Sequence, residues 1–243
     1  MYLIVGGDSA IGKELSLYLK TKKIPHCSST RQFKLISEYR PYIDLAKNEW
    51  KDLDKYNFDA VVFCAAITKL SVCEEFPNLT HEVNVRGTSA LAKYLIERGS
   101  RILLLSTDKV FDGSKMKYFS KDQVKPICEY GRQKVEVEKI ILGTPNSVIL
   151  RLTKVIHPGL PLLIKWSNEL QMGRAIYAYT DMYLSPISIE KVIKKIEQLL
   201  SKKMTGIIHL YGDEEVSYYN FAKQYFRNSY DVDSLILEQK SRI

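Results

Sequence analysis

Residues 2–12 read YLIVGGDSAIG, and this stretch decides the fold. Tyr2–Val5 is a short apolar run typical of a buried strand, and it ends at two glycines. From Ile11 onward, apolar residues recur at helical spacing as far as Leu19. A strand that passes through a glycine-rich loop directly into a helix is typical of a dinucleotide-binding unit, in which phosphates lie on free N–H groups at the helix N-terminus. The same glycines can also serve an ordinary strand-to-helix turn.

Short apolar strands alternate with amphipathic helices along the first 150 residues. Beyond the first unit, strands are predicted at 25–28, 59–64, 101–105 and 147–152, and helices at 88–98 and 130–142. This alternation indicates parallel strands covered by helices on both faces. The predicted fold class is therefore α/β, with a doubly wound parallel sheet of the Rossmann type.

After Pro158 the alternation is less regular. Helices are predicted at 163–172, 189–200 and 217–226, and a strand at 205–211. We therefore expect a nucleotide-binding domain at residues 1–157 and a smaller substrate lobe at residues 158–243 that does not fold independently. In this lobe Arg174 can meet a diphosphate, and the aromatic rings can stack on a nucleobase or simply pack the core; the rings are Trp166, Tyr177, Tyr179 and Tyr183.

Composition limits the class of protein. The chain has 243 residues, a formal net charge of +8 and 45% hydrophobic residues, which is typical of a soluble globular protein. Basic residues are scattered among acidic ones, which argues against a nucleic-acid partner. No apolar run is long enough for a membrane span or a signal peptide, so we expect a cytoplasmic protein. The four cysteines lack metal-ligand spacing, and no metal site is expected.

The segment after the second strand favours one nicotinamide cofactor. Ser29, Thr30 and Arg31 follow that strand, where NAD-binding proteins carry an acidic residue that binds the ribose diol. Arg31 would instead bind a 2′-phosphate. The sequence therefore predicts NADP(H) in preference to NAD(H), with NAD(H) left open because Arg31 can also be an ordinary solvated loop residue.

A Tyr-x-x-x-Lys pair begins the helix at 130–142. Tyr130 and Lys134 are one turn apart and share a helix face. We expect the ammonium to lower the pKa of the phenol, which would make it an acid or base near neutrality. Thr107 follows the strand at 101–105, at the edge where parallel sheets bind ligands, and can hydrogen-bond a substrate carbonyl oxygen. By itself the Tyr–Lys pair can equally be a helix-surface contact.

Together these motifs resemble the extended short-chain dehydrogenases/reductases and, within them, the dTDP-4-dehydrorhamnose reductase group. The matching segments are GGDSAIG (6–12), Asp44-Leu45, CAAIT (64–68), VNVRGT (83–88), STDKVFDG (106–113), YGRQK (130–134) and IIHLYGDEEVSYYNFAK (207–223). Three features differ from the family pattern. Ser9 stands where the family has a glycine, Asp181–Pro186 matches a second-lobe motif only loosely, and the C-terminus is shortened, because family members continue beyond residue 243.

The resemblance implies an NADPH-dependent reductase that acts on the 4-keto group of a nucleotide-linked deoxysugar in polysaccharide precursor synthesis. It implies that Tyr130 donates the proton, Lys134 holds the nicotinamide ribose and tunes Tyr130, and Thr107 polarises the ketone. Asp108 would lie near the sugar. The residues placed along the cofactor, besides Tyr130, Lys134 and Arg31, are Gly6, Ser9, Ala10, Ile11, Gly12, Asp44, Leu45, Ala65 and Ala66.

Two other functions stay open. A nucleotide-sugar epimerase or dehydratase with tightly bound cofactor usually needs extra acid–base residues, and the absence of a glutamate beside Asp108 argues against a dehydratase. A non-catalytic NADP-binding regulatory subunit of the same fold, such as the β subunit of methionine adenosyltransferase, would not need the intact Thr107, Tyr130 and Lys134. The identity of the sugar and the oligomeric state, a homodimer included, are not specified by the sequence.

Overall fold

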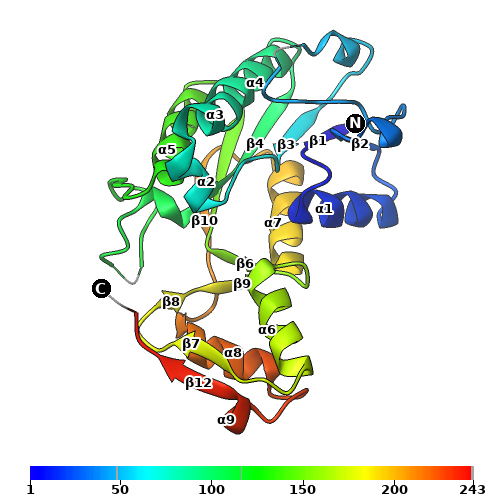
Figure 1. Ribbon diagram of the computed structural model, residues 1–243. Coiled ribbons are helices and arrows are strands. Elements are labelled where there is room, and N and C mark those ends of the chain that lie inside the picture. The colour runs from blue at the N-terminus through cyan, green and yellow to red at the C-terminus, as the bar shows by residue number, and fades with distance from the viewer. Residues whose placement is uncertain (48, 116, 242–243) are drawn as a thin grey trace. The chain divides into compact units, whose positions relative to one another are not determined.

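The computed structural model describes residues 1–47, 49–115 and 117–241 (Figure 1). The chain forms two compact units: Met1–Leu152 with Glu190–Leu210, and Thr153–Ile189 with the segment that begins at Tyr211. This division differs from the one expected at residue 158. Residues 190–210 belong to the first unit because the strand they contain pairs with the main sheet.

A six-stranded parallel sheet forms the centre of the first unit. The strand order is β10 (Gly206–Leu210), β5 (Ser147–Leu152), β4 (Arg101–Thr107), β3 (Ala60–Phe63), β1 (Tyr2–Val5) and β2 (His26–Ser28). Every neighbouring pair is parallel, so the predicted doubly wound parallel sheet is confirmed. The chain order reverses between β1 and β3, and such a switch point leaves a crevice at the carboxyl ends of the two strands.

Four helices cover the sheet (Figure 1). On one face lie α4 (Thr88–Ile96) and α5 (Glu129–Leu142), and on the other α1 (Ala10–Thr21) and α7 (Ile189–Ser201). The Tyr18 hydroxyl of α1 donates a 2.6 Å hydrogen bond to Glu197 of α7. Shorter elements connect the strands: η1 (Phe33–Leu35), η2 (Lys51–Leu53), α2 (Leu70–Glu75), α3 (Pro77–His81), the π-helix η3 (Glu82–Gly87) and η4 (Asp108–Val110).

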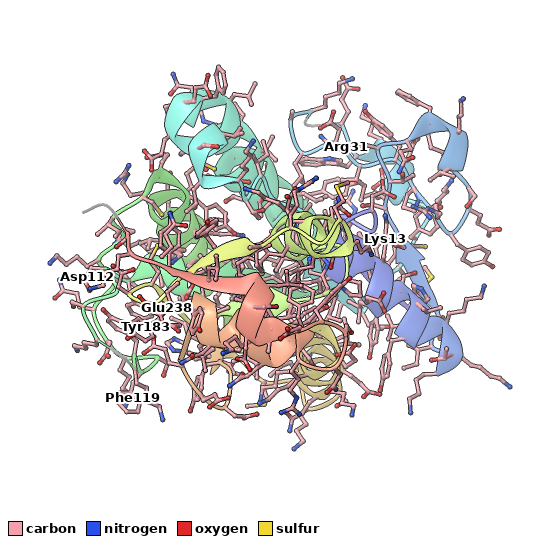
Figure 2. The ribbon with its side chains drawn as sticks, turned by 60° about the horizontal axis from the view of Figure 1, so that its bottom comes forward. Lys13, Arg31, Asp112, Phe119, Tyr183 and Glu238 are labelled. Atoms are coloured by element: carbon pink, nitrogen blue, oxygen red, sulfur yellow. The ribbon has the colours of Figure 1, made fainter. Side chains whose placement is uncertain are left out.

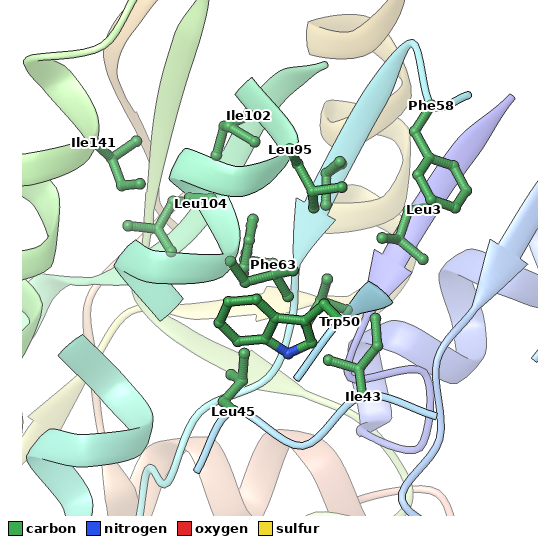
Figure 3. Packing of buried hydrophobic residues seen from close by; sticks show 14 of the residues in the cluster. Leu3, Ile43, Leu45, Trp50, Phe58, Phe63, Leu95, Ile102, Leu104 and Ile141 are labelled. Carbon is green, nitrogen blue, oxygen red and sulfur yellow. The ribbon is translucent and has the colours of Figure 1, made fainter. Parts of the chain in front are cut away.

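Alternate strand residues form the core beneath α4 and α5 (Figure 3). Strand residues alternate between the two faces of a sheet, which directs Leu3, Val61, Phe63, Ile102, Leu104 and Ile149 to this one. Trp50, from the long connection between β2 and β3, is 7% exposed and packs in the same cluster. Each such side chain contributes about 1.5–3 kcal/mol when fully buried.

The second unit contains α6 (Pro161–Gln171), α8 (Tyr218–Phe226) and α9 (Val232–Leu235). Its strands form three pairs: β6 (Lys154–Ile156) with β9 (Pro186–Ser188), β7 (Ile176–Tyr179) with β12 (Ile236–Gln239), and β8 (Tyr183–Leu184) with β11 (Val216–Ser217). Trp166, one of the rings considered for nucleobase stacking, is 5% exposed and packs within this unit's own core. Tyr177 and Tyr183 are exposed.

Gly12 is where α1 approaches the glycine loop most closely. A Cβ on Gly12 would lie 2.2 Å from the carbonyl oxygen of Gly6, so Gly12→Ala is expected to lower the free energy of unfolding by about 1–3 kcal/mol. Urea denaturation measures the change. Gly143→Ala is the matched control, because the nearest atom to its Cβ is a backbone oxygen at 3.4 Å. Equal stability of the two variants would contradict the close packing at Gly12.

Candidate cofactor and catalytic site

A cavity of about 270 Å³ lies at the switch point of the sheet. Of the residues predicted to bind a cofactor, seven line it together: Gly6, Ser9, Arg31, Asp44, Leu45, Ala65 and Ala66. Ala10, Ile11 and Gly12 follow directly in the first turn of α1. Three further predicted residues, Thr107, Tyr130 and Lys134, do not line this cavity and are grouped at the end of β4 and the start of α5.

The loop between β1 and α1 has the geometry that a phosphate-binding loop requires. Gly6 has a φ of +86°, and a Cβ there would lie 2.6 Å from the backbone nitrogen of Ala65. Ser9 has a φ of −72°, which explains why a residue with a side chain fits where the family has glycine. The Ser9 hydroxyl accepts a 3.1 Å hydrogen bond from the Gly12 N–H and caps α1.

This geometry fits the diphosphate of a dinucleotide. The N–H groups of Ala10 and Ile11 come too early in α1 to have a carbonyl partner one turn before them. The first turn of α1 contains no acidic side chain, so the positive end of the helix dipole is not neutralised there. Lys13 and Arg31 lie on the exposed surface of the same unit (Figure 2).

The turn η4, directly after β4, packs against the helix that carries the Tyr–Lys pair. A Cβ on Gly131 would lie 2.1 Å from the carbonyl oxygen of Lys109, so the glycine in YGRQK permits this contact. Lys134 Nζ donates a 2.9 Å hydrogen bond to the carbonyl of Leu105 and lies 5.9 Å from the centroid of the Tyr130 ring. Thr107 ends β4, and its hydroxyl donates to the Asp108 carboxylate at 3.1 Å.

Burial controls the acid–base properties of this pair. Burial is the largest influence on the pKa of Tyr130 and raises it above its usual value, and Cys73, Asp108 and Cys128 raise it further. The expected lowering of this pKa is therefore wrong for this structure, because the loss of solvation is the largest influence and raises the pKa. Burial also lowers the pKa of Lys134 to about 8, although Glu138 opposes this shift. Tyr130 is thus protonated at neutral pH, which is the state that a proton donor needs.

A buried ion pair lies one turn further along α5. Glu138 and Arg151 are joined by a 2.6 Å contact between Oε2 and Nη2, and their side chains are 3% and 4% exposed. The Ser106 hydroxyl of β4 also donates to Glu138, and Arg151 donates to His209 of β10 at 3.2 Å. The network ties α5 to three strands of the sheet. The sequence prediction missed it, although an arginine inside the apolar strand SVILRL was a signal for a buried partner.

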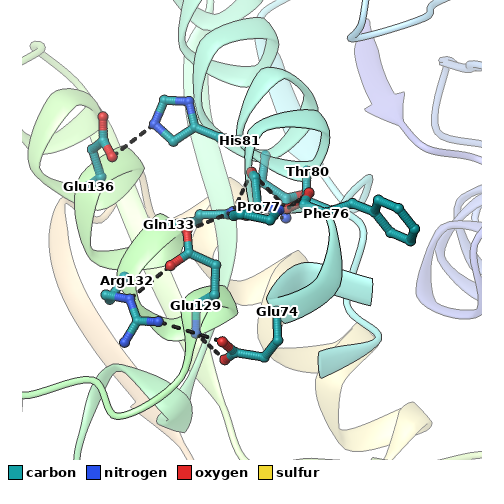
Figure 4. Close-up of polar contacts among 10 residues, drawn as sticks. Glu74, Phe76, Pro77, Thr80, His81, Glu129, Arg132, Gln133 and Glu136 are labelled. Atoms are coloured by element: carbon teal, nitrogen blue, oxygen red, sulfur yellow. Dashed lines mark hydrogen bonds and ion pairs between the residues drawn. The ribbon is translucent and has the colours of Figure 1, made fainter. Parts of the chain in front are cut away.

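Further polar contacts hold the first turns of α5 (Figure 4). Gln133 donates hydrogen bonds to Thr80 at 2.9 Å and to the carbonyl of Pro77 at 3.2 Å. Asn84, in the segment VNVRGT, donates to Gln133 at 2.8 Å and accepts from the backbone N–H of Ile67 at 2.8 Å. Asn84 therefore connects the loop after β3 to the helix that carries Tyr130. The burial of this polar side chain in the π-helix η3 was not interpreted from the sequence.

The two residues predicted to meet the sugar nucleotide have partners within their own units. Arg174 lies just beyond the end of α6 and forms two hydrogen bonds with Glu169, at 2.6 and 3.1 Å. The Asp108 carboxylate accepts a hydrogen bond from the Thr107 hydroxyl. Their roles toward a substrate remain predictions.

No group of three or more His, Cys, Asp or Glu side chains within residues 1–47, 49–115 and 117–241 is arranged to hold a metal ion. Within the same ranges, no helix has the length and apolar character needed to cross a bilayer. The cysteines are free thiols, and Cys27 and Cys73 are buried.

Known proteins are similar to this chain in sequence and in fold. The family model described as the RmlD substrate binding domain matches residues 1–239. A dTDP-4-dehydrorhamnose reductase from Aggregatibacter actinomycetemcomitans is 32% identical over 179 residues, which cover 70% of this chain and 61% of that protein. The chain spans about three fifths of the length of the first curated relatives, with 61%, 60% and 60% covered.

Two solved structures show the fold over almost the whole chain. A hypothetical dTDP-4-dehydrorhamnose reductase from Sulfolobus tokodaii superposes with a TM-score of 0.85 at 26% identity, over 99% of this chain and 86% of that one. A dTDP-4-dehydrorhamnose reductase from Bacillus anthracis, solved in complex with NADP, has a TM-score of 0.87 at 20% identity, over 99% and 84%.

The buried ion pair has a measurable effect on stability. Glu138→Ala leaves the Arg151 guanidinium buried without its carboxylate, so the free energy of unfolding should fall by about 3–5 kcal/mol in urea denaturation. Glu82→Ala is the matched control, because Glu82 pairs with Arg86 on the surface, where the side chains are 51% and 68% exposed. A loss for Glu138→Ala no larger than that of the control would contradict the structural role of the buried pair.

The lowered pKa of Lys134 can be measured directly. In a protein labelled with ¹³C at lysine Cε, the signal that disappears in Lys134→Met should titrate near 8, and the exposed lysines near 10.4. Because the folded chain loses this proton before the unfolded chain does, the unfolding free energy of the wild type should rise relative to Lys134→Met as the pH increases from 8 to 10.5. A Lys134 signal that titrates with the exposed lysines would show that burial does not perturb this group.

Proposed function

This chain belongs to the RmlD substrate binding domain family, and from that membership we propose that it is an NADPH-dependent reductase of the 4-keto group of a nucleotide-linked deoxysugar. The observation that carries the proposal is the grouping of Thr107, Tyr130 and Lys134 by β4 and α5. These residues lie at the carboxyl edge of the same parallel sheet whose switch point holds the cavity. The name of the Aggregatibacter relative supports the same reaction.

NADPH would supply the hydride to the ketone carbon. The residues that would hold it are those of the cavity: the Gly6–Ser9 loop and the first N–H groups of α1 for the diphosphate, and Ala65 and Ala66 along its length. Gly6 has no room for a Cβ beside Ala65, so the loop packs tightly against the segment after β3 at the edge of the cavity. The Bacillus anthracis structure supports the choice of NADP.

Three residues of the chain would then act on the ketone oxygen of the substrate. Tyr130 is protonated at neutral pH and delivers its proton to that oxygen. The Lys134 ammonium, 5.9 Å from the Tyr130 ring centroid, stabilises the phenolate that remains. The Thr107 hydroxyl, which donates to Asp108 in this structure, turns to donate to the ketone oxygen.

The alternatives differ in whether NADPH is consumed. A reductase consumes it in proportion to product, an epimerase regenerates its cofactor, and a non-catalytic subunit binds it without turnover. The buried Lys134 supports a catalytic role, because a lysine with a lowered pKa is costly to keep in a fold that does not use it. A cytoplasmic location and a homodimer remain predictions of the same proposal.

Tyr130→Phe tests the proposed proton donor. The variant keeps the ring and removes the hydroxyl, so kcat for NADPH oxidation with a dTDP-4-keto-6-deoxyhexose should fall about 10²–10⁴-fold while NADPH binding persists. Tyr225→Phe, at an exposed position on α8, is the control. Turnover in Tyr130→Phe equal to that of the control would rule out this role for Tyr130, and the absence of turnover by the wild type across a panel of nucleotide 4-keto sugars would contradict the proposed activity.

Arg174→Ala tests the proposed contact with the substrate diphosphate. The variant should raise KM for the nucleotide-sugar about 10-fold or more and leave the Kd for NADPH unchanged. Glu169→Gln is the matched variant, because it breaks the same ion pair but keeps the guanidinium. A similar rise in KM for both variants would mean that the pair only stabilises the second unit.

A further inference from the structure

A carboxylate of the glycine loop lies at the end of β2. Asp8 lines the cavity, and its Oδ2 atom accepts hydrogen bonds from the Thr30 hydroxyl at 2.7 Å and from the Arg31 N–H at 3.4 Å. Its Oδ1 atom accepts from Arg40 Nη2 at 2.6 Å. Asp8 thus connects the loop that would hold the diphosphate to the segment after β2, which recognises the adenine ribose in such folds.

The backbone around Arg40 is fixed against β2. The Ser28 N–H donates to the carbonyl of Tyr39 at 2.9 Å, and the Thr30 N–H donates to that of Pro41 at 3.1 Å. Arg40 exchanges two backbone hydrogen bonds with Ser37, at 3.0 and 3.2 Å. These hydrogen bonds fix the backbone of Arg40 beside the end of β2, although Arg40 lies nine residues after Arg31 in the sequence.

The Arg40 guanidinium is only partly used. One Nη atom binds Asp8, while the Nε atom is buried and has no hydrogen-bond partner within the part of the chain that the structure describes. The side chains of Arg40 and Asp8 are 36% and 29% exposed, so the pair is open to solvent on one side. An arginine held in this way has N–H groups left for a second acceptor.

We propose that Asp8 and Arg40 set the choice between NADPH and NADH, with Arg40 joining Arg31 as a ligand of the 2′-phosphate. The inference rests on the proposed function and names the residues that select its cofactor. A carboxylate accepts hydrogen bonds from the hydroxyls of an unphosphorylated ribose and repels a phosphate dianion. An arginine neutralises that carboxylate and binds the phosphate. The Asp8 carboxylate therefore favours NADH, and the Arg40 guanidinium favours NADPH. Removal of the carboxylate should increase the preference for NADPH, and removal of the guanidinium should decrease it.

Binding of 2′,5′-ADP and of 5′-AMP, measured by isothermal titration calorimetry, tests this inference. The two probes differ only in the 2′-phosphate and need neither nicotinamide nor sugar, so the result does not depend on turnover. Arg40→Met should weaken 2′,5′-ADP binding about 10- to 100-fold and leave 5′-AMP binding within a few-fold. Asp8→Asn should increase the preference for 2′,5′-ADP over 5′-AMP about 10-fold.

Two further variants separate recognition from structure. Arg40→Lys keeps the positive charge and should keep most of the preference for 2′,5′-ADP. This variant also tests the inference if Arg40→Met folds poorly. Arg86→Met removes a surface arginine that pairs with Glu82 and should leave both affinities unchanged.

Equal losses for the two probes in Arg40→Met would mean that the pair only clamps the loop, and an unchanged ratio in both Asp8→Asn and Arg40→Met would assign recognition to Arg31 alone. Either result overturns the inference while the proposed reductase function stands. Failure of the wild type to bind either probe would instead contradict the proposed function itself.

Discussion

The buried ion pair between Glu138 and Arg151 holds together the elements on which the candidate catalytic site depends. Removing two charges from water is costly, and here the cost is offset by several hydrogen bonds between the guanidinium and the carboxylate and by the Ser106 hydroxyl. Glu138 is on α5, one turn after Lys134, and its partners lie on β4 and β5. The position of Tyr130 and Lys134 relative to Thr107 therefore follows from a contact that touches none of the three.

Two ion pairs in the first unit differ in exposure, and this difference gives them different roles. Glu138 and Arg151 are 3% and 4% exposed, so their contact is a fixed part of the core. Asp8 lines the cavity and is 29% exposed, and Arg40, which pairs with it, is 36% exposed, so the partners of these side chains can be exchanged for those of a ligand. A half-exposed pair can respond to a bound phosphate with little loss of stability, because surface ion pairs contribute little to the folded state.

Local sequence patterns were sufficient for the strands of the central sheet, for the helices α1, α4, α5 and α7 that cover it, and for the glycine loop, whereas α2 and α3 were not predicted. The segment YLIVGGDSAIG has the periodicity of a strand and then of a helix, and both form where predicted. Contacts between distant residues were not predictable in this way. The pairing of β10 with β5, which moves residues 190–210 into the first unit, depends on packing across the whole sheet. Asp8 and Arg40 are 32 residues apart, and the direction of the pKa shift of Tyr130 depends on its burial, which no four-residue motif specifies.

In the proposed reaction hydride passes from NADPH to the ketone carbon while Tyr130 supplies the proton, and transfer of an isotope label follows the hydride directly. The wild-type chain is incubated with NADPH that carries deuterium at both C4 hydrogens and with a dTDP-4-keto-6-deoxyhexose, and the sugar product is examined by mass spectrometry and NMR. We expect a single deuterium at C4 of the product sugar. A reduced product without deuterium at C4, or an epimerised 4-keto sugar with no net oxidation of NADPH, would contradict it.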